Sequence, residues 1–156
     1  MNNHGQITVE YILIMSIIII MIIFASSTIF EETEKNTILT SAQIGAQIGI
    51  DKNAYAMYYN DTFNNYQQNY PKLLSPTELK IIEINMTQEK NEIKLQATLH
   101  SNTYLNANEK DIISSRINYY IRKTISETFE TENNDLYYEN LQINNQKIKT
   151  KKVKWV

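Results

Sequence analysis

A run of 20 residues without a charged side chain, Tyr11–Phe30, constrains this chain more than any other feature. As a helix, this run spans about 30 Å, the thickness of the hydrocarbon core of a bilayer. Its centre, Ile17–Phe24, is apolar at every position and leaves the helix no polar face toward water. In lipid a single segment satisfies its backbone hydrogen bonds only as a helix. The run therefore predicts a membrane-spanning helix; the alternative is a buried core helix of a soluble domain.

The helical pattern continues beyond this run. Glu31–Lys35 consists of residues that a helix accepts, with neither glycine nor proline. Apolar positions then recur at helical spacing and predict an amphipathic continuation to about Asn60. These positions are Ile38, Leu39, Ala42, Ile44, Ala46, Ile48, Gly49, Ala54, Met57 and Tyr58. Gly45 and Gly49 form a small-xxx-small pair, which allows another helix to approach closely but also suits a bend.

The next part of the chain changes its period from helical to alternating. Residues 60–76 are polar and aromatic without a clear period and read as a loop. Ile82–Met86 and Ile93–Leu99 then alternate apolar and polar side chains. With a turn at Gln88–Asn91 between them, these segments predict a β-hairpin that buries one face.

The last third predicts one helix and further strands. Helical spacing returns over Asp111–Phe129, with Asp111 as the candidate cap. Strand candidates follow at Leu141–Ile143 and Lys147–Val156, separated by a turn at residues 144–146; the alternation of the second is imperfect. The expected fold class is α+β: a long N-terminal hydrophobic helix carrying a small, mostly antiparallel β head of about four strands with one further helix.

Composition excludes several classes of function. The net charge of -2 and the pI of about 5.7 give no support to a nucleic-acid partner. The chain has no cysteine, which excludes disulfides and thiolate metal sites. His4 and His100 are far apart in the sequence, and no phosphate loop or nucleophile motif is present. We therefore expect no enzymatic activity, no cofactor and no metal.

The first ten residues form a short polar leader that ends with one carboxylate, Glu10, before the apolar run. A secretory signal usually begins with positive charge, has a shorter apolar region and ends at a small-residue cleavage site. This leader has no lysine or arginine, and its apolar run is longer. Ala25–Ser27 could still serve as a secretory cleavage site, so that alternative stays open.

Gly5-Gln6, followed by Glu10 and the apolar run, resembles the class III signal peptide of archaeal type IV pilin-like proteins. The resemblance covers about the first 30 residues. It implies that a membrane-bound prepilin-type aspartic peptidase cuts between Gly5 and Gln6 and leaves the apolar segment in the mature chain. It also implies that Glu10 meets the new ammonium group of a neighbouring subunit. Leaders of this family commonly carry lysine or arginine before the cut, whereas this one has only His4 and the amino terminus.

Together, the resemblance and the periodicity predict four regions: a leader at 1–5, a transmembrane and assembly helix at 6–30, its amphipathic continuation at 31–60, and an extracellular head at 61–156. The implied partners are membrane lipid, the prepilin-type peptidase and other pilin subunits. The implied location is the membrane for the precursor, with the head outside, and a surface filament after assembly. The alternative is a membrane-anchored or secreted surface protein that does not polymerise.

Two weaker signals concern the surface of the head. Asn60 and Asn85 each begin an N-x-T sequon and are candidate glycosylation sites. The lysines between Lys147 and Lys154 predict a solvated strand whose charges block edge pairing; attraction to an anionic surface is the alternative.

Overall fold

The computed structural model describes residues 3–51, 79–131 and 135–156, and the chain divides into two compact units, residues 1–37 and 38–156. Helix α1, Asn3–Asp51, contributes to both units. The prediction of a long N-terminal apolar helix is confirmed. Its predicted last turns, at 52–60, and the predicted loop at 60–76 lie outside the described residues.

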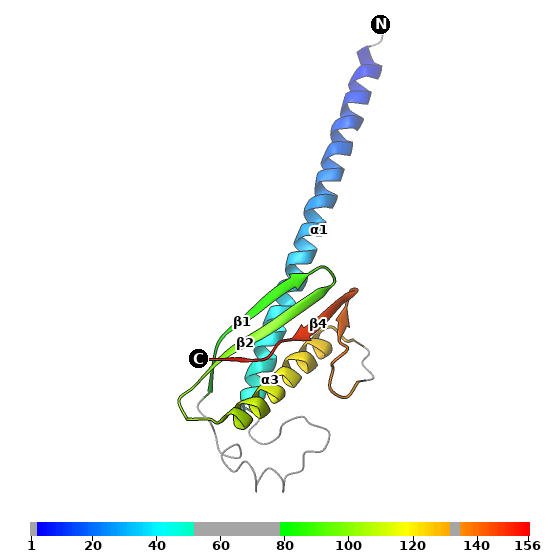
Figure 1. Ribbon diagram of the computed structural model, residues 1–156. Coiled ribbons are helices and arrows are strands. Elements are labelled where there is room, and N and C mark those ends of the chain that lie inside the picture. Colours follow the sequence, from blue (N-terminus) through cyan, green and yellow to red (C-terminus); the bar gives the residue numbers. More distant parts are fainter. Residues whose placement is uncertain (1–2, 52–78, 132–134) are drawn as a thin grey trace. The chain divides into compact units, whose positions relative to one another are not determined.

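The second unit holds a five-stranded sheet with the strand order β1-β2-β4-β3, and β5 pairs with β2 (Figure 1). The strands are β1 Leu79–Glu89, β2 Glu92–Ser101, β3 Gln142–Ile143, β4 Gln146–Thr150 and β5 Lys154–Trp155. The pairs β1–β2 and β3–β4 are antiparallel, whereas β4 and β5 run parallel to β2. Helix α3, Ala107–Thr128, lies between β2 and the later strands in the chain and supplies the crossover that a parallel pair needs. The predicted α+β class is confirmed, with five strands in place of about four.

Strands β1 and β2 form the predicted hairpin, closed by a two-residue turn at Lys90 and Asn91. All four apolar residues of β2 are buried, as the alternation predicts: Ile93, Leu95, Ala97 and Leu99. In β1, the prediction for Ile82 is wrong, because a β-bulge between Ile81 and Glu83 shifts the register. The extra residue lets Ile81 pack against the core and leaves Ile82 exposed.

The predicted strand at the C-terminal end is two short strands, β4 and β5, interrupted at residues 151–153. Ile148 and Val153 are five positions apart and would face opposite sides of one continuous strand, yet both are buried. The interruption resets the alternation and explains why the sequence pattern is imperfect. The predicted turn before β4 is confirmed at Asn144 and Asn145, which both adopt positive φ, 44° and 67°.

Helix α3 begins four residues before its predicted cap. The Asn106 side chain accepts a hydrogen bond from the Glu109 N–H, the Glu109 carboxylate accepts one from the Asn106 N–H, and both are 2.8 Å long. This capping box replaces Asp111 as the start of the helix, so the prediction of Asp111 as the cap is wrong. The apolar stripe is as predicted and is at most 1% exposed: Ile113, Ile117, Ile121 and Ile125.

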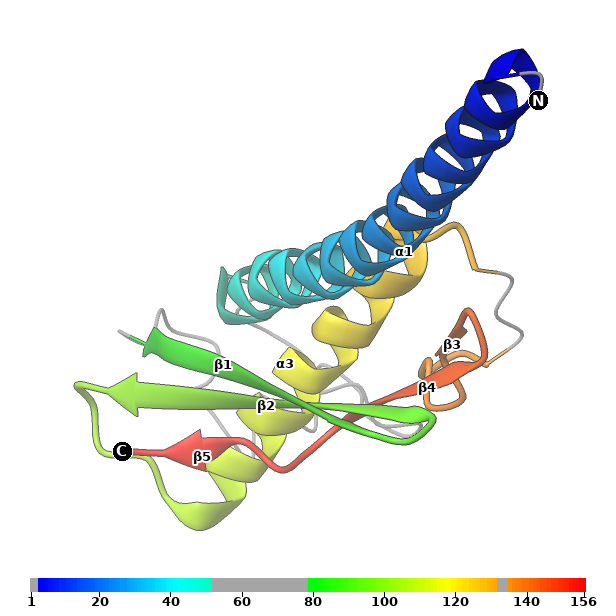
Figure 2. The same cartoon turned by 90° about the horizontal axis from the view of Figure 1, so that it is seen from above.

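Residues 38–51 of α1 pack on α3 within the second unit, and the two helices lie side by side in Figure 1 and Figure 2. The buried apolar face of this part of α1 consists of Ile38, Ala42, Ala46 and Ile50. A Cβ atom placed on Gly45 would lie 2.5 Å from the carbonyl oxygen of Tyr120, and one on Gly49 would lie 2.9 Å from the Ile117 Cα. The small-xxx-small pair therefore serves a close backbone contact inside the head.

We predict that Gly45→Ala destabilises the head by about 1–3 kcal/mol, because the added methyl group has no room against α3. Helix propensity alone would have the opposite sign, since alanine is favoured over glycine by about 1 kcal/mol. Thermal unfolding of the full chain in detergent, followed by circular dichroism, measures the effect.

The control for this prediction is Gln43→Ala, because Gln43 lies on the exposed face of the same helical turn. We expect little change in the melting temperature of this variant. A higher melting temperature for Gly45→Ala than for the unmodified chain would contradict the close contact.

Candidate functional site

The candidate site is the apolar part of α1, whose large side chains are exposed. Every large apolar side chain from Tyr11 to Phe30 is exposed, between 39% at Met15 and 74% at Phe30. The exposed residues surround the helix on all sides, because the run Ile17–Phe24 has no polar position. Water does not tolerate a continuous apolar surface of this size, so another apolar phase must cover it.

Three hydroxyl groups within this segment are compatible with an apolar environment. Ser16 Oγ donates a hydrogen bond to the Ile12 carbonyl oxygen at 2.7 Å. Ser27 Oγ and Thr28 Oγ1 both donate to the carbonyl oxygen of Phe24, at 2.8 and 3.2 Å. A buried hydroxyl is costly only when it lacks a hydrogen-bond partner. These three side chains can therefore enter lipid or a protein interior without loss of hydrogen bonding.

By length and composition, α1 is able to cross a membrane: the described part of the chain contains one such helix, and its most apolar 18-residue window has no buried residue. Charged residues resume at Glu31, immediately after the apolar run. Glu32 and Lys35 form an exposed i,i+3 ion pair at 4.0 Å, in which water screens most of the attraction. This charged turn defines one limit of the apolar segment.

The sequence-predicted residues Gly5, Gln6 and Glu10 all lie on α1. Gly5 and Gln6 belong to the first helical turn, where backbone N–H groups have no intrahelical partner and the helix unwinds most easily. Glu10 is one turn beyond Gln6, and its side chain is exposed. A chain that began at Gln6 would thus place an ammonium group and a carboxylate about one turn apart on the helix.

Of the two sequons, Asn60 lies outside the described residues. Asn85 is on the exposed face of β1, where its Nδ2 donates to Glu83 Oε1 at 2.9 Å. Glycosylation at either position stays a prediction. Among the residues that the structure describes, no three His, Cys, Asp or Glu side chains are grouped as a metal site would require.

Sequence reasoning missed a set of contacts that holds the segment after α3. Arg122 donates through Nε and Nη2 to the carbonyl oxygen of Tyr137, at 3.1 and 3.0 Å, and through Nη1 to Thr150 Oγ1 at 2.6 Å. Burial lowers the pKa of Arg122, but arginine stays charged at any physiological pH. Arg122 therefore links α3 to the segments that contain Tyr137 and Thr150. No local sequence pattern predicts these contacts.

Comparison with known proteins does not assign this chain to a family: no family model, no curated protein and no solved structure matches it.

We predict that Ile19→Lys strongly reduces the membrane-inserted fraction of the protein, because a lysine at the centre of a membrane helix costs about 3 kcal/mol. Membrane fractionation, followed by alkaline extraction of the pellet, measures this fraction. Ile19→Leu keeps the apolar surface and is the matched control, which should insert normally. Unchanged insertion of Ile19→Lys would mean that protein, and not lipid, covers this segment.

Proposed function

We propose that this protein is a structural subunit of a type IV pilus-like surface filament. It is made as a membrane-inserted precursor with its head outside, and a prepilin-type aspartic peptidase cuts it between Gly5 and Gln6. Its role is structural and not catalytic. The observation that carries this proposal is the helix that is exposed and apolar on all sides, with a single carboxylate, Glu10, at its beginning.

The apolar surface of α1 supports two successive environments for the same segment. In the precursor, lipid covers Tyr11–Phe30, whose length matches the bilayer core. In a filament, the same surface is covered by the corresponding helices of other subunits. Both environments remove the side chains from water, so the transfer from one to the other keeps their hydrophobic stabilisation.

Glu10 favours a filament subunit over a surface protein that is only anchored. A carboxylate at the edge of an apolar run does not help a helix to enter lipid. A cut after Gly5 creates a positive charge at Gln6, and packing of helices buries that charge. A buried charge needs an oppositely charged partner, which Glu10 of a neighbouring subunit can provide.

The first test concerns processing. We predict that protein isolated from native membranes begins at Gln6, because the polar leader is removed and the apolar segment is retained. Intact mass and N-terminal sequencing measure the cut. A chain that begins at or after Thr28 would mean that a secretory signal has been removed, and it would contradict the proposed function.

The second test concerns assembly. We predict that Glu10→Gln leaves the membrane-bound pool intact or larger but abolishes or shortens filaments, because an unpaired buried charge costs about 3–5 kcal/mol. The substitution keeps the shape of the side chain and removes only its charge. Filaments are counted by electron microscopy after shearing from cells.

The matched control is Glu31→Gln, which removes an exposed carboxylate just beyond the apolar run. We expect filaments of normal length from this variant. If Glu10→Gln also gave filaments of normal length and number, the carboxylate would have no role in assembly, and the anchored-protein alternative would be favoured.

A further inference from the structure

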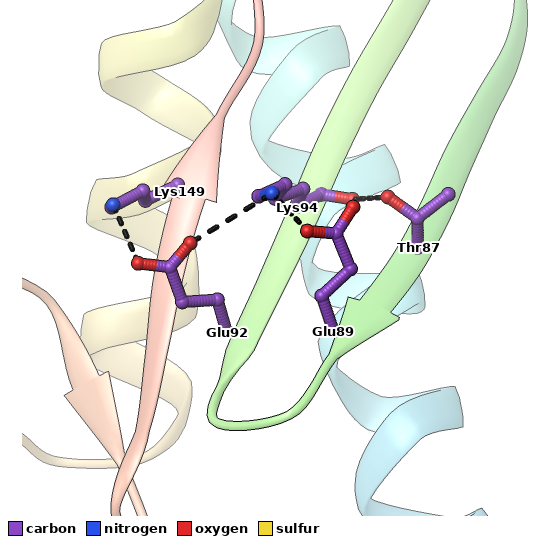
Figure 3. A network of polar contacts seen from close by, with 5 residues as sticks. All are labelled: Thr87, Glu89, Glu92, Lys94 and Lys149. Atoms are coloured by element: carbon purple, nitrogen blue, oxygen red, sulfur yellow. Dashed lines mark hydrogen bonds and ion pairs between the residues drawn. The ribbon is translucent and has the colours of Figure 1, made fainter.

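The face of the sheet opposite α3 is polar and is not covered by any described segment. Figure 3 shows its side chains in front of the strands and α3 behind them. The alternation along the strands places these residues on the face: Lys80, Glu83, Asn85 and Thr87 of β1; Lys94, Gln96, Thr98 and His100 of β2; Lys147 and Lys149 of β4; and Lys154 of β5. We call this set, together with Glu89 and Glu92 near the hairpin turn, the outer face.

Ion pairs on the outer face involve two of its three carboxylates, Glu89 and Glu92, and only some of its lysines. Lys149 Nζ lies 2.6 Å from Glu92 Oε1, and Lys94 contacts both Glu89 and Glu92 (Figure 3). Hydrogen bonds from these lysines lower the pKa of Glu89 and of Glu92, so both carboxylates stay ionised at neutral pH. Within the described part of the chain, Lys80, Lys147 and Lys154 have no ion pair.

The outer face has the opposite sign of charge to the rest of the chain. Five lysines against three glutamates give it a net charge of +2, whereas the whole chain carries -2. All other residues together therefore carry -4. A second copy of this chain therefore carries a net negative charge outside its own outer face.

Lys147 of β4 does not have the edge-blocking role that the sequence predicts for it. Lys147 pairs with Glu92 of β2 on one side and with Gln142 of β3 on the other, so β4 is an internal strand. An internal strand has no free edge to protect. Its lysines instead contribute to the surplus positive charge of the outer face.

Carboxylates collect on another part of the head, at the C-terminal end of α3. Glu127 and Glu130 are exposed there, and the last turn of α3 contains no basic residue. A helix C-terminus carries partial negative charge, so carboxylates at this end are destabilising unless a cation approaches. The ion pair between Glu127 and Lys123 is long, at 3.8 Å, and exposed. We call Glu127 and Glu130 the acidic end.

We propose that the outer face binds the acidic end of a second copy of this chain. The contact is heterologous, because two different surfaces of the head meet, and repetition of such a contact gives an open polymer and not a closed dimer. The inference rests on the proposed function and adds to it a contact between heads, beside the contact between apolar helices.

Disulfide cross-linking in assembled filaments tests the contact, and the absence of native cysteine makes introduced pairs unambiguous. Glu130→Cys is combined in turn with Lys80→Cys, Lys147→Cys and Lys154→Cys in the full chain. Copper phenanthroline oxidises the filaments before a non-reducing gel. We expect at least one pair to give a ladder of covalent oligomers, because each chain then links to two neighbours. Variants with a single cysteine form dimers at most and are the controls.

A bond within one chain cannot mimic this result for Lys154. Trp155 Nε1 lies 3.1 Å from Ser114 Oγ, so Lys154 is near the first half of α3. The helix rises about 21 Å from Ser114 to Thr128, whereas a disulfide needs Cα atoms within about 7 Å. If filaments form but no pair gives a ladder, the inference is wrong and the proposed function stands. If the unmodified chain forms no filaments, the proposed function itself is wrong.

Charge exchange is the second measurement. The double variant Lys147→Glu with Lys154→Glu should give no filaments in the sheared fraction. The double variant Glu127→Lys with Glu130→Lys should have the same effect. All four substitutions together should restore filaments, because the attraction is only inverted. Failure of the fourfold variant to restore filaments, despite normal membrane levels, would overturn the inference. So would a glycan on Asn85 in assembled filaments, because Asn85 lies on the outer face.

Discussion

The uncharged surface of Tyr11–Phe30 is the constraint on which the rest of this protein depends. A helix that is apolar on all sides cannot remain in water, and the described residues of this chain do not cover it. The backbone satisfies itself, and the hydroxyls of Ser16, Ser27 and Thr28 donate to carbonyl groups of the same helix. The exposed apolar side chains then require only an apolar environment from outside the chain. In the proposed function, lipid meets that requirement before assembly and neighbouring helices meet it afterwards.

The same helix also builds the core of the head, and it does so by a different physical principle. Beyond Thr37, α1 becomes amphipathic and contributes one buried face. Gly45 and Gly49 remove the side chains that would hold α3 away, so the backbones of the two helices come into contact. Dispersion between close-packed atoms and burial of isoleucine side chains stabilise this contact. One continuous helix thus contributes both the segment that leaves water and part of the domain that stays in it.

In the proposed filament, charge has a different effect at each of the two contacts between subunits. At Glu10, a single carboxylate is useful only when packing buries it beside an ammonium group, so its contribution is large but conditional. On the outer face of the sheet the charges are exposed, so each ion pair contributes little to stability. For association with another subunit, the net charge of the whole face matters more than any one ion pair. Exposed charges of this kind set orientation and specificity, while the apolar helix supplies the affinity.

The sequence by itself determined the long apolar helix, the α+β class, the hairpin and the apolar stripe of α3, because each depends on a local period. It also named Gly5, Gln6 and Glu10, and the structure adds only their place on α1, since the roles proposed for them involve other molecules. Tertiary structure decided the bulge that exposes Ile82, the Asn106 cap, the break between β4 and β5, and the role of the two glycines. It also brought the lysines of β1, β2, β4 and β5 to one face. Those features depend on which distant segments pair and in what register, and periodicity along one segment does not contain that information.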